Sequence, residues 1–145
     1  MSRRTVVRLV AALSLGAAAT LAVPALPAVG SHSPPTFAHD VEILGPGTLV
    51  SRGAGVSVPV EVTCGEGGEV AFVDVRLTQR RGNRVSTGFG STQVTCTGSP
   101  QTVDVLVTAQ NGSFKKGPAL AEAHLVACNP TTCQSDTDIE EIAVK

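Results

Sequence analysis

The sequence predicts an all-β protein, an antiparallel β-sandwich of about seven to nine short strands with two disulfides. The first observation is strict alternation, because apolar residues occupy every second position at Val56, Val58, Val60, Val62 and Cys64. A period of two places alternate side chains on opposite faces of a strand, so this stretch has one apolar face. The second observation is that similar stretches follow, separated by turn residues about every eight to twelve positions. The third observation is four cysteines in a chain of 145 residues.

Residues 1–30 have the composition of a cleaved secretory signal peptide. Three arginines stand near the start, residues 9–23 are apolar or small, and small residues with prolines occupy 24–28. The apolar run is shorter than the roughly twenty residues of a membrane span, so we expect no stable membrane anchor after cleavage. The cleavage site stays open between Ala25, Ala28 and Gly30. Arg3 and Arg4 also fit a twin-arginine signal, and either export route makes the protein secreted and extracellular.

The rest of the chain has the length of one domain. We expect residues 31–36 to be an extended N-terminus and residues 37–145 to form the sandwich. The whole chain has 11 Lys and Arg against 12 Asp and Glu. Three of the bases and none of the acids lie in residues 1–30, which leaves 8 against 12, a net charge of −4. This balance argues against nucleic-acid binding, which needs a basic surface.

Four cysteines in an exported domain predict two disulfides. Three pairings are possible, and the spacing favours Cys64 with Cys96 and Cys128 with Cys133. The second pair encloses a short turn in which Pro130 takes the first central position. On the loop-entropy model, the longer loop contributes about 3.5 kcal/mol to the free energy of unfolding and the shorter one about 2 kcal/mol.

The first half of the domain contains three expected strands. Residues 37–44 and 48–51 are short candidates, separated by a Gly-Pro-Gly break at 45–47. The stretch 56–64 follows, and we expect its cysteine to reach the strand-like run 94–96 as a partner. Pro59 cannot donate to a β-ladder, so an edge or an irregular ladder is expected at that position.

A hairpin occupies the middle of the domain. Residues 71–78 alternate between apolar and polar, residues 81–84 form the connection, and the return strand carries Val85, Thr87 and Phe89. Gly88 and Gly90 weaken this strand or mark bulges. Four arginines lie close together along the chain, at positions Arg76, Arg80, Arg81 and Arg84. A hairpin tip with solvated charges accounts for them without any ligand.

Residues 102–108 supply a later strand and the last strand lies within 137–144, and the stretch between them is ambiguous. Its small and apolar residues are Ala119, Ala121, Ala123, Leu125 and Ala127. Alanine, leucine and glutamate favour a helix. The strict alternation and the cysteine pair that follows favour a strand in a hairpin, which is the interpretation we prefer.

Three groups of residues are similar to those of a known class of proteins. They are Val62-Thr63-Cys64, the run Val94-Thr95-Cys96-Thr97-Gly98, and Phe114-Lys115-Lys116-Gly117-Pro118-Ala119 before the alanine-rich strand. From Cys64 onward, about half of the chain, the sequence resembles the small secreted immunoglobulin-like domains of actinobacteria, many of which have no assigned function. The resemblance implies an immunoglobulin-like β-sandwich with a role outside the cell.

A second likeness lies in the run Cys128-Asn129-Pro130-Thr131-Thr132-Cys133-Gln134. It looks like the short disulfide hairpin of the neocarzinostatin group of chromophore-carrying apoproteins, which are also secreted sandwiches with two disulfides. This likeness implies a small-ligand carrier. The chain departs from that group in the wide spacing of its other two cysteines and in lacking the aromatic residues of the pocket.

No residues suggest a catalytic, cofactor or metal site. The chain has no nucleophile-elbow motif, and His32, His39 and His124 are expected on the surface. Zinc would need Cys128 and Cys133 as thiolates, whereas an oxidising compartment makes them a disulfide. An acidic run lacks the spacing of a calcium loop and fits a solvated edge strand: Asp136, Asp138, Glu140 and Glu141. The absence of Trp and Tyr argues against a sugar-binding surface and against protein hot spots of the usual kind.

These observations lead to a non-enzymatic secreted protein, a binding or structural module at the cell exterior. Its partner is expected to be an extracellular protein or a small ligand. The first alternative is a small-ligand carrier in which the face formed by residues 119–127 lines a cleft. The second alternative is a protease inhibitor, with residues 97–100 or 128–133 as the reactive loop.

Overall fold

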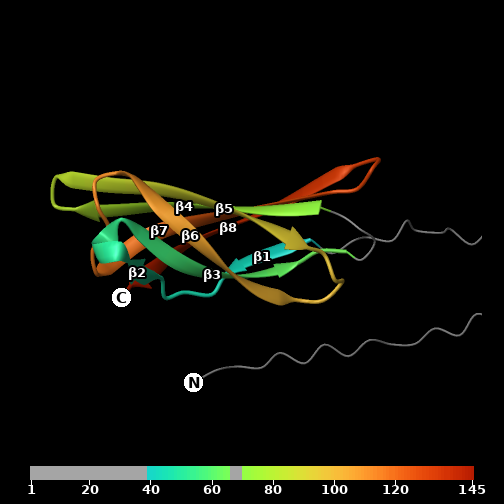
Figure 1. Cartoon of the computed structure of the whole chain (residues 1–145), viewed down its shortest axis with the longest axis horizontal. Coiled ribbons are helices and arrows are strands. Elements are labelled where there is room, and N and C mark those ends of the chain that lie inside the picture. The colour runs from blue at the N-terminus through green and yellow to red at the C-terminus, as the bar shows by residue number, and fades with distance from the viewer. Residues whose placement is uncertain (1–38, 66–69) are drawn as a thin grey trace, which may run out of the picture. The chain divides into compact units, whose positions relative to one another are not determined.

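Eight β-strands form one continuous sheet in the computed structural model, which describes residues 39–65 and 70–145 (Figure 1). The predicted signal peptide and the extended segment 31–36 lie outside the described residues. Adjacent strands are antiparallel, in the order β1–β3–β6–β5–β4–β7–β8, and β2 also pairs with β3. The strands are β1 Asp40–Ile43, β2 Thr48–Val50, β3 Gly55–Thr63, β4 Val70–Arg81, β5 Arg84–Thr95, β6 Gln101–Asn111, β7 Gly117–Cys128 and β8 Cys133–Val144. One turn of 3-10 helix, η1 Ser51–Gly53, follows β2, and no helix in the described part of the chain is long and apolar enough to cross a membrane.

The sheet folds over its own core as a sandwich. One layer contains β1, β2, β3 and β6, and the other contains β5, β4, β7 and β8. The layers join where the first residues of β5 pair with the end of β6, at Thr87–Phe89 and Thr108–Asn111. Inward positions are nearly all aliphatic, and Phe114 is the one aromatic ring among the buried residues described. The prediction of an all-β sandwich is therefore confirmed.

The two ends of the strand order approach each other, so the sheet is nearly closed. At one end of the seam, the backbone N–H of Gly47 donates to Ala143 O at 3.0 Å, and the N–H of Leu49 donates to Lys145 O at 2.9 Å. At the other end, carboxylate oxygens of Asp136 and Asp138 accept hydrogen bonds from β1. These contacts cover part of both edge strands, which is a known protection against edge-to-edge pairing.

The irregular ladder expected at Pro59 is present in β3. On one side, β3 pairs with β1 through residues 60–63 and with β2 through residues 55–57. Pro59 lies in the gap between these partners, and its carbonyl accepts a hydrogen bond from the N–H of Leu44 at 3.0 Å. Its missing N–H therefore falls where the chain passes from β1 to β2.

The expectation that the cysteine after β3 reaches the run 94–96 is confirmed, because Cys64 and Cys96 form a disulfide. Val94 and Thr95 end β5, which pairs with β4 along its whole length, and Cys96 follows directly. The disulfide, with 5.1 Å between Cα atoms, connects the ends of strands in opposite layers. The bulge expected near Gly88 is confirmed, since the β5–β6 register shifts between Thr87 and Gly88.

The strand interpretation of residues 119–127 is confirmed, because they lie in β7. Their small side chains face the core, where Ala121 and Ala123 are completely buried. The expectation that this face lines a cleft is therefore wrong, since it packs against the other layer. A short turn joins β7 to β8, and the predicted disulfide between Cys128 and Cys133 closes it. In that turn, Asn129 Oδ1 accepts hydrogen bonds from the N–H groups of Thr131 and Thr132 at 2.9 and 2.8 Å.

Candidate functional site

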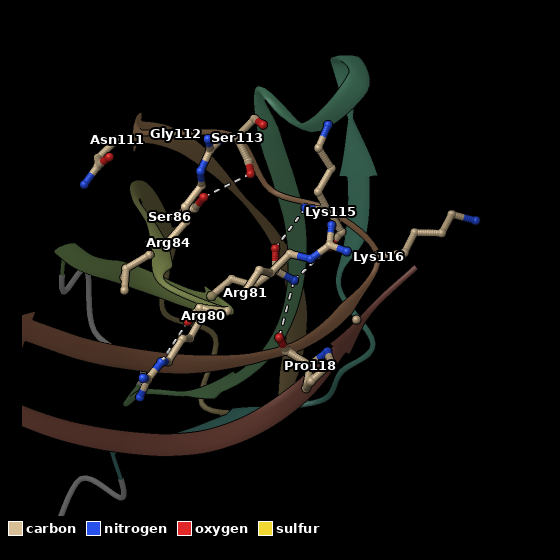
Figure 2. Close-up of a pocket in the computed structure, with 14 residues that line it drawn as sticks. Arg80, Arg81, Arg84, Ser86, Asn111, Gly112, Ser113, Lys115, Lys116 and Pro118 are labelled. Carbon is tan, nitrogen blue, oxygen red and sulfur yellow. Dashed lines mark hydrogen bonds between the residues drawn. The ribbon is translucent and has the colours of Figure 1, made fainter.

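A hollow of about 1040 Å³ opens between the tip of the β4–β5 hairpin and the loop that joins β6 to β7 (Figure 2). Residues 79–82 and 84–86 line it from the hairpin, and residues 111–113 and 115–118 line it from the loop. We call this the basic hollow, because its five ionisable side chains are all cations: Arg80, Arg81, Arg84, Lys115 and Lys116. No carboxylate lines the basic hollow, although the whole chain has a net charge of −1. The positive charge is therefore a local feature of this end of the sandwich.

The hairpin places two of these cations directly opposite each other on its two strands. Arg81 and Arg84 form the last pair of the β4–β5 ladder, and Gly82 and Asn83 make the turn between them. Gly82 has a φ of 57°, which suits a two-residue hairpin turn that begins with glycine. The connection predicted at residues 81–84 is thus confirmed. Like charges directly opposite in a ladder destabilise a sheet, so this pair has an energetic cost without an anion.

The loop side of the basic hollow is fixed by Gln79, a buried amide on β4. Its Nε2 donates to Lys115 O at 2.8 Å and to Pro118 O at 3.3 Å, and its Oε1 accepts from the N–H of Lys115 at 2.9 Å. Gln79 is only 2% exposed, so these three bonds lie in an environment where an unmatched polar group is expensive. They hold the backbone that carries Lys115 and Lys116 in one position.

A second anchor of the loop is Phe114, whose side chain is completely buried. Its N–H donates to Gly53 O at 2.9 Å, and its ring lies against Gly88, where an added Cβ would come within 2.8 Å of Cζ. On the hairpin side, Ser86 Oγ donates to Ser113 O at 3.0 Å. The loop is therefore attached to both layers and to the core, so the lysines stand on a supported backbone.

Sequence reasoning missed Gln79 and Phe114, although each left a signal. Gln79 extends the inward-facing period of residues 71–77 by one step, which places a polar residue on a core position. Phe114 is a lone aromatic residue in a loop rich in glycine and lysine. Recognising either as an anchor requires knowing that the 111–118 loop folds back over the end of β4.

The arginines that lie together in the sequence separate in the structure. Arg80, Arg81 and Arg84 border the basic hollow with exposed side chains, as expected for a hairpin tip. Arg80 Nε also donates to Gly82 O at 3.3 Å. Arg76 instead lies further along β4 on the outer face of its layer, between Phe89 of β5 and Glu122 of β7. A smaller hollow of about 390 Å³ is found there, and Arg76 and His124 are among its lining residues.

The other candidate residues have structural surroundings. His39 precedes β1 and is half-buried, and His32 lies outside the described residues. All four cysteines are in disulfides, so none is a thiolate for zinc. Within residues 39–65 and 70–145, no three His, Cys, Asp or Glu side chains are grouped as metal ligands would be. The acidic run is more than a solvated edge, because Asp136 and Asp138 bind the backbone of β1.

The chemistry of the basic hollow is that of an anion receptor. Guanidinium groups donate paired N–H bonds in the geometry of phosphate and sulfate oxygens, and ammonium groups add point charges. Hydrogen bonds to charged acceptors are about twice as strong as neutral ones. Figure 2 shows the side chain of Arg81 extending toward the loop that carries Lys115. Comparison with known proteins adds no assignment, since no family model and no curated protein matches the sequence.

Proposed function

We propose that the protein is a secreted, non-enzymatic binding module that holds an anionic group of its ligand in the basic hollow. The observation that carries the proposal is the uncompensated charge, because Arg81 opposes Arg84 and no carboxylate lines the hollow. A sheet avoids like charges in direct opposition unless something offsets their repulsion. An anion bound between the hairpin tip and the loop offsets it. The signal-like residues 1–30 and the two disulfides support a role outside the cell.

The ligand class follows from charge and shape. Five cations around an open hollow suit a group with two or more negative charges, such as a phosphate or sulfate ester. The acidic remainder of the domain repels a long polyanion that extends beyond the hollow, which disfavours duplex nucleic acid. Recognition through exposed cations is screened by salt, so affinity falls steeply as ionic strength rises.

Calorimetric titration with inorganic pyrophosphate at low and high salt tests the proposal. We expect binding at low salt that weakens at high salt, and a loss of about tenfold or more in affinity for Arg81→Ala and for Lys116→Ala. Arg76→Ala is the matched control, because Arg76 is on the same strand but does not line the basic hollow. No binding by the unmodified protein, or an equal loss in the control, would exclude this function.

The two alternatives have separate tests. A carrier would need one of the two hollows rather than the buried alanine face, and a bound molecule would appear as excess mass in a native mass spectrum. For an inhibitor, the candidate loops at 97–100 and 128–133 consist largely of exposed residues. A panel of proteases at micromolar protein concentration shows whether either loop blocks cleavage.

A further inference from the structure

The outer face of the layer β5–β4–β7–β8 has β4 and β7 at its centre, and Figure 1 labels the four strands. We call it the outer sheet face. Each of its four strands has 12 residues, and β4 and β7 are paired from Val70 opposite Cys128 to Thr78 opposite Leu120. Large apolar side chains are exposed on it: Val70, Phe72, Phe89, Leu120 and Ile139. Phe72 and Ile139 are 46% and 59% exposed, so the face has apolar surface available for contact.

The centre of the outer sheet face has four polar side chains in a checkerboard. Asp74 and Arg76 are successive outward residues of β4, and His124 and Glu122 are their partners across the ladder on β7. Acidic groups therefore occupy one diagonal, and Arg76 with the imidazole of His124 occupies the other. A checkerboard of this kind is complementary to its own copy when the copy is turned over a two-fold axis lying in the face.

One axis pairs all four central polar side chains with suitable partners. If it runs parallel to the strands between β4 and β7, then β4 of one copy lies over β7 of the second copy. Arg76 then faces Glu122 of the second copy, and Asp74 faces its His124, which can donate a hydrogen bond. The contacts are repeated by symmetry, as in every isologous interface.

Three of the exposed apolar residues also match about the same axis. Phe72 faces Val126 of the second copy, because these two residues are ladder partners within one copy. Phe89 and Ile139 flank the Arg76–Glu122 pair on the outer strands, so each faces the other across the interface. An axis perpendicular to the strands instead places Phe72 over Thr78 of the second copy. The axis parallel to the strands places Phe72 against Val126 and Phe89 against Ile139, with charge against opposite charge, and leaves Leu120 facing Thr78.

The available area is sufficient for a dimer. Four strands about 4.8 Å apart and 12 residues long at about 3.3 Å per residue cover roughly 19 Å by 40 Å. Contact over this face buries about 750 Å² per copy, or about 1,500 Å² in total, which is the size of a standard specific interface. Two twisted sheets packed face to face at about 10 Å are an ordinary sandwich arrangement.

We propose that the outer sheet face is the contact surface of a symmetric homodimer whose two-fold axis runs between β4 and β7, parallel to the strands. This proposal is independent of the basic hollow, which lies at the hairpin tip and the 111–118 loop. The partner is a second copy of this chain because the pattern of charge and apolar residues is complementary to itself.

Sedimentation velocity of the purified protein with its disulfides formed tests the dimer over a range of concentrations. We expect reversible association, with a dissociation constant raised about 100-fold by Arg76→Glu or by Glu122→Arg, since each places two like-charge contacts in the interface. The double variant Arg76→Glu/Glu122→Arg restores association, because the charges are exchanged but remain opposite. Leu106→Ser is the matched control on β6, where Leu106 is 55% exposed in the other layer.

Three results would overturn the proposed dimer. A monomer at the highest concentration overturns it, as does a loss of association in Leu106→Ser as large as that in Arg76→Glu. Failure of the double variant to associate overturns it as well, provided that the melting temperature shows a folded protein. Phe72→Ser supplies an independent readout without any change of charge. Its dissociation constant is expected to be at least tenfold higher than that of the unmodified protein.

Discussion

The carboxylate of Asp138 on β8 accepts a hydrogen bond from the backbone N–H of Ile43 on β1, at 2.9 Å and 95 residues away in sequence. Asp136 does the same for Val41 at 3.0 Å. A side chain thereby takes the place of a backbone carbonyl along the seam between the two edge strands. These two hydrogen bonds connect β8 to β1 at positions where the two strands form no backbone ladder.

Replacement of Asp138 by Ala is expected to lower the free energy of unfolding by about 1–3 kcal/mol, because the part-buried N–H of Ile43 loses its acceptor. Asp138→Asn keeps an oxygen acceptor and should lose less. Glu140→Ala, at an exposed position of the same strand, is the control. Urea denaturation measures all three, and an equal loss for Asp138→Ala and Glu140→Ala would contradict the role of the carboxylate.

Gln79→Ala is expected to destabilise the protein by about 2–4 kcal/mol. The change leaves the N–H of Lys115 and the carbonyls of Lys115 and Pro118 without their amide partner in a buried site. Hydrogen exchange should also become faster at the Lys115 amide. Gln93→Ala on the exposed side of β5 is the control, and unchanged exchange at Lys115 would show that the loop is held by other contacts.

Gly90→Ala is expected to cost at least about 3 kcal/mol, because an added Cβ would meet the backbone carbonyl oxygen of Leu106 at 2.3 Å. The backbones of β5 and β6 would have to separate where the two layers join. Gly82→Ala has open space around its Cβ and suffers only from its positive φ, so a loss of about 1 kcal/mol is expected there. Thermal unfolding of both variants checks the order, and a larger loss at Gly82 would contradict it.

Alternation and cysteine spacing were sufficient to predict the strands, because both depend on local sequence. β3 and β7 illustrate this, since period two identified their inward faces without knowledge of their partners. Pro59 was also interpretable locally, since a missing donor requires a break in the ladder. The strand order was not predictable in the same way, because the disulfide between Cys64 and Cys96 was predicted without the ladder neighbours of residues 94–96. A disulfide constrains the distance between two residues, whereas strand pairing depends on the whole packing of the layers.

The candidate site was the least predictable feature, because it is assembled from distant segments. Arg81 and Lys115 are 34 positions apart in the sequence and line the same hollow because Gln79, with the other loop anchors, ties the loop to the sheet. The sequence grouped Arg76 with the tip arginines, whereas its position on β4 places it opposite Glu122. Side-chain neighbours across a sheet follow from register, and register is a long-range property.

The arginine pair at the hairpin tip leads to a test that separates function from stability. Arg84→Thr removes a like charge directly opposite Arg81, so the free energy of unfolding is expected to rise by about 0.5 kcal/mol at low salt and by less at high salt. The same variant should bind pyrophosphate more weakly, because the basic hollow loses a guanidinium. Arg76→Thr is the matched control, and it should instead lower stability slightly, since Arg76 lies opposite Glu122.

Chemical denaturation at two salt concentrations, together with titration of pyrophosphate, measures both effects of Arg84→Thr. A gain in stability combined with a loss of binding would mean that the charge at the tip is retained for its ligand at the expense of the fold, as is usual for functional sites. A loss of stability in Arg84→Thr would mean that the arginine makes favourable contacts in the free protein, and the argument for an anion from unrelieved repulsion would then fail.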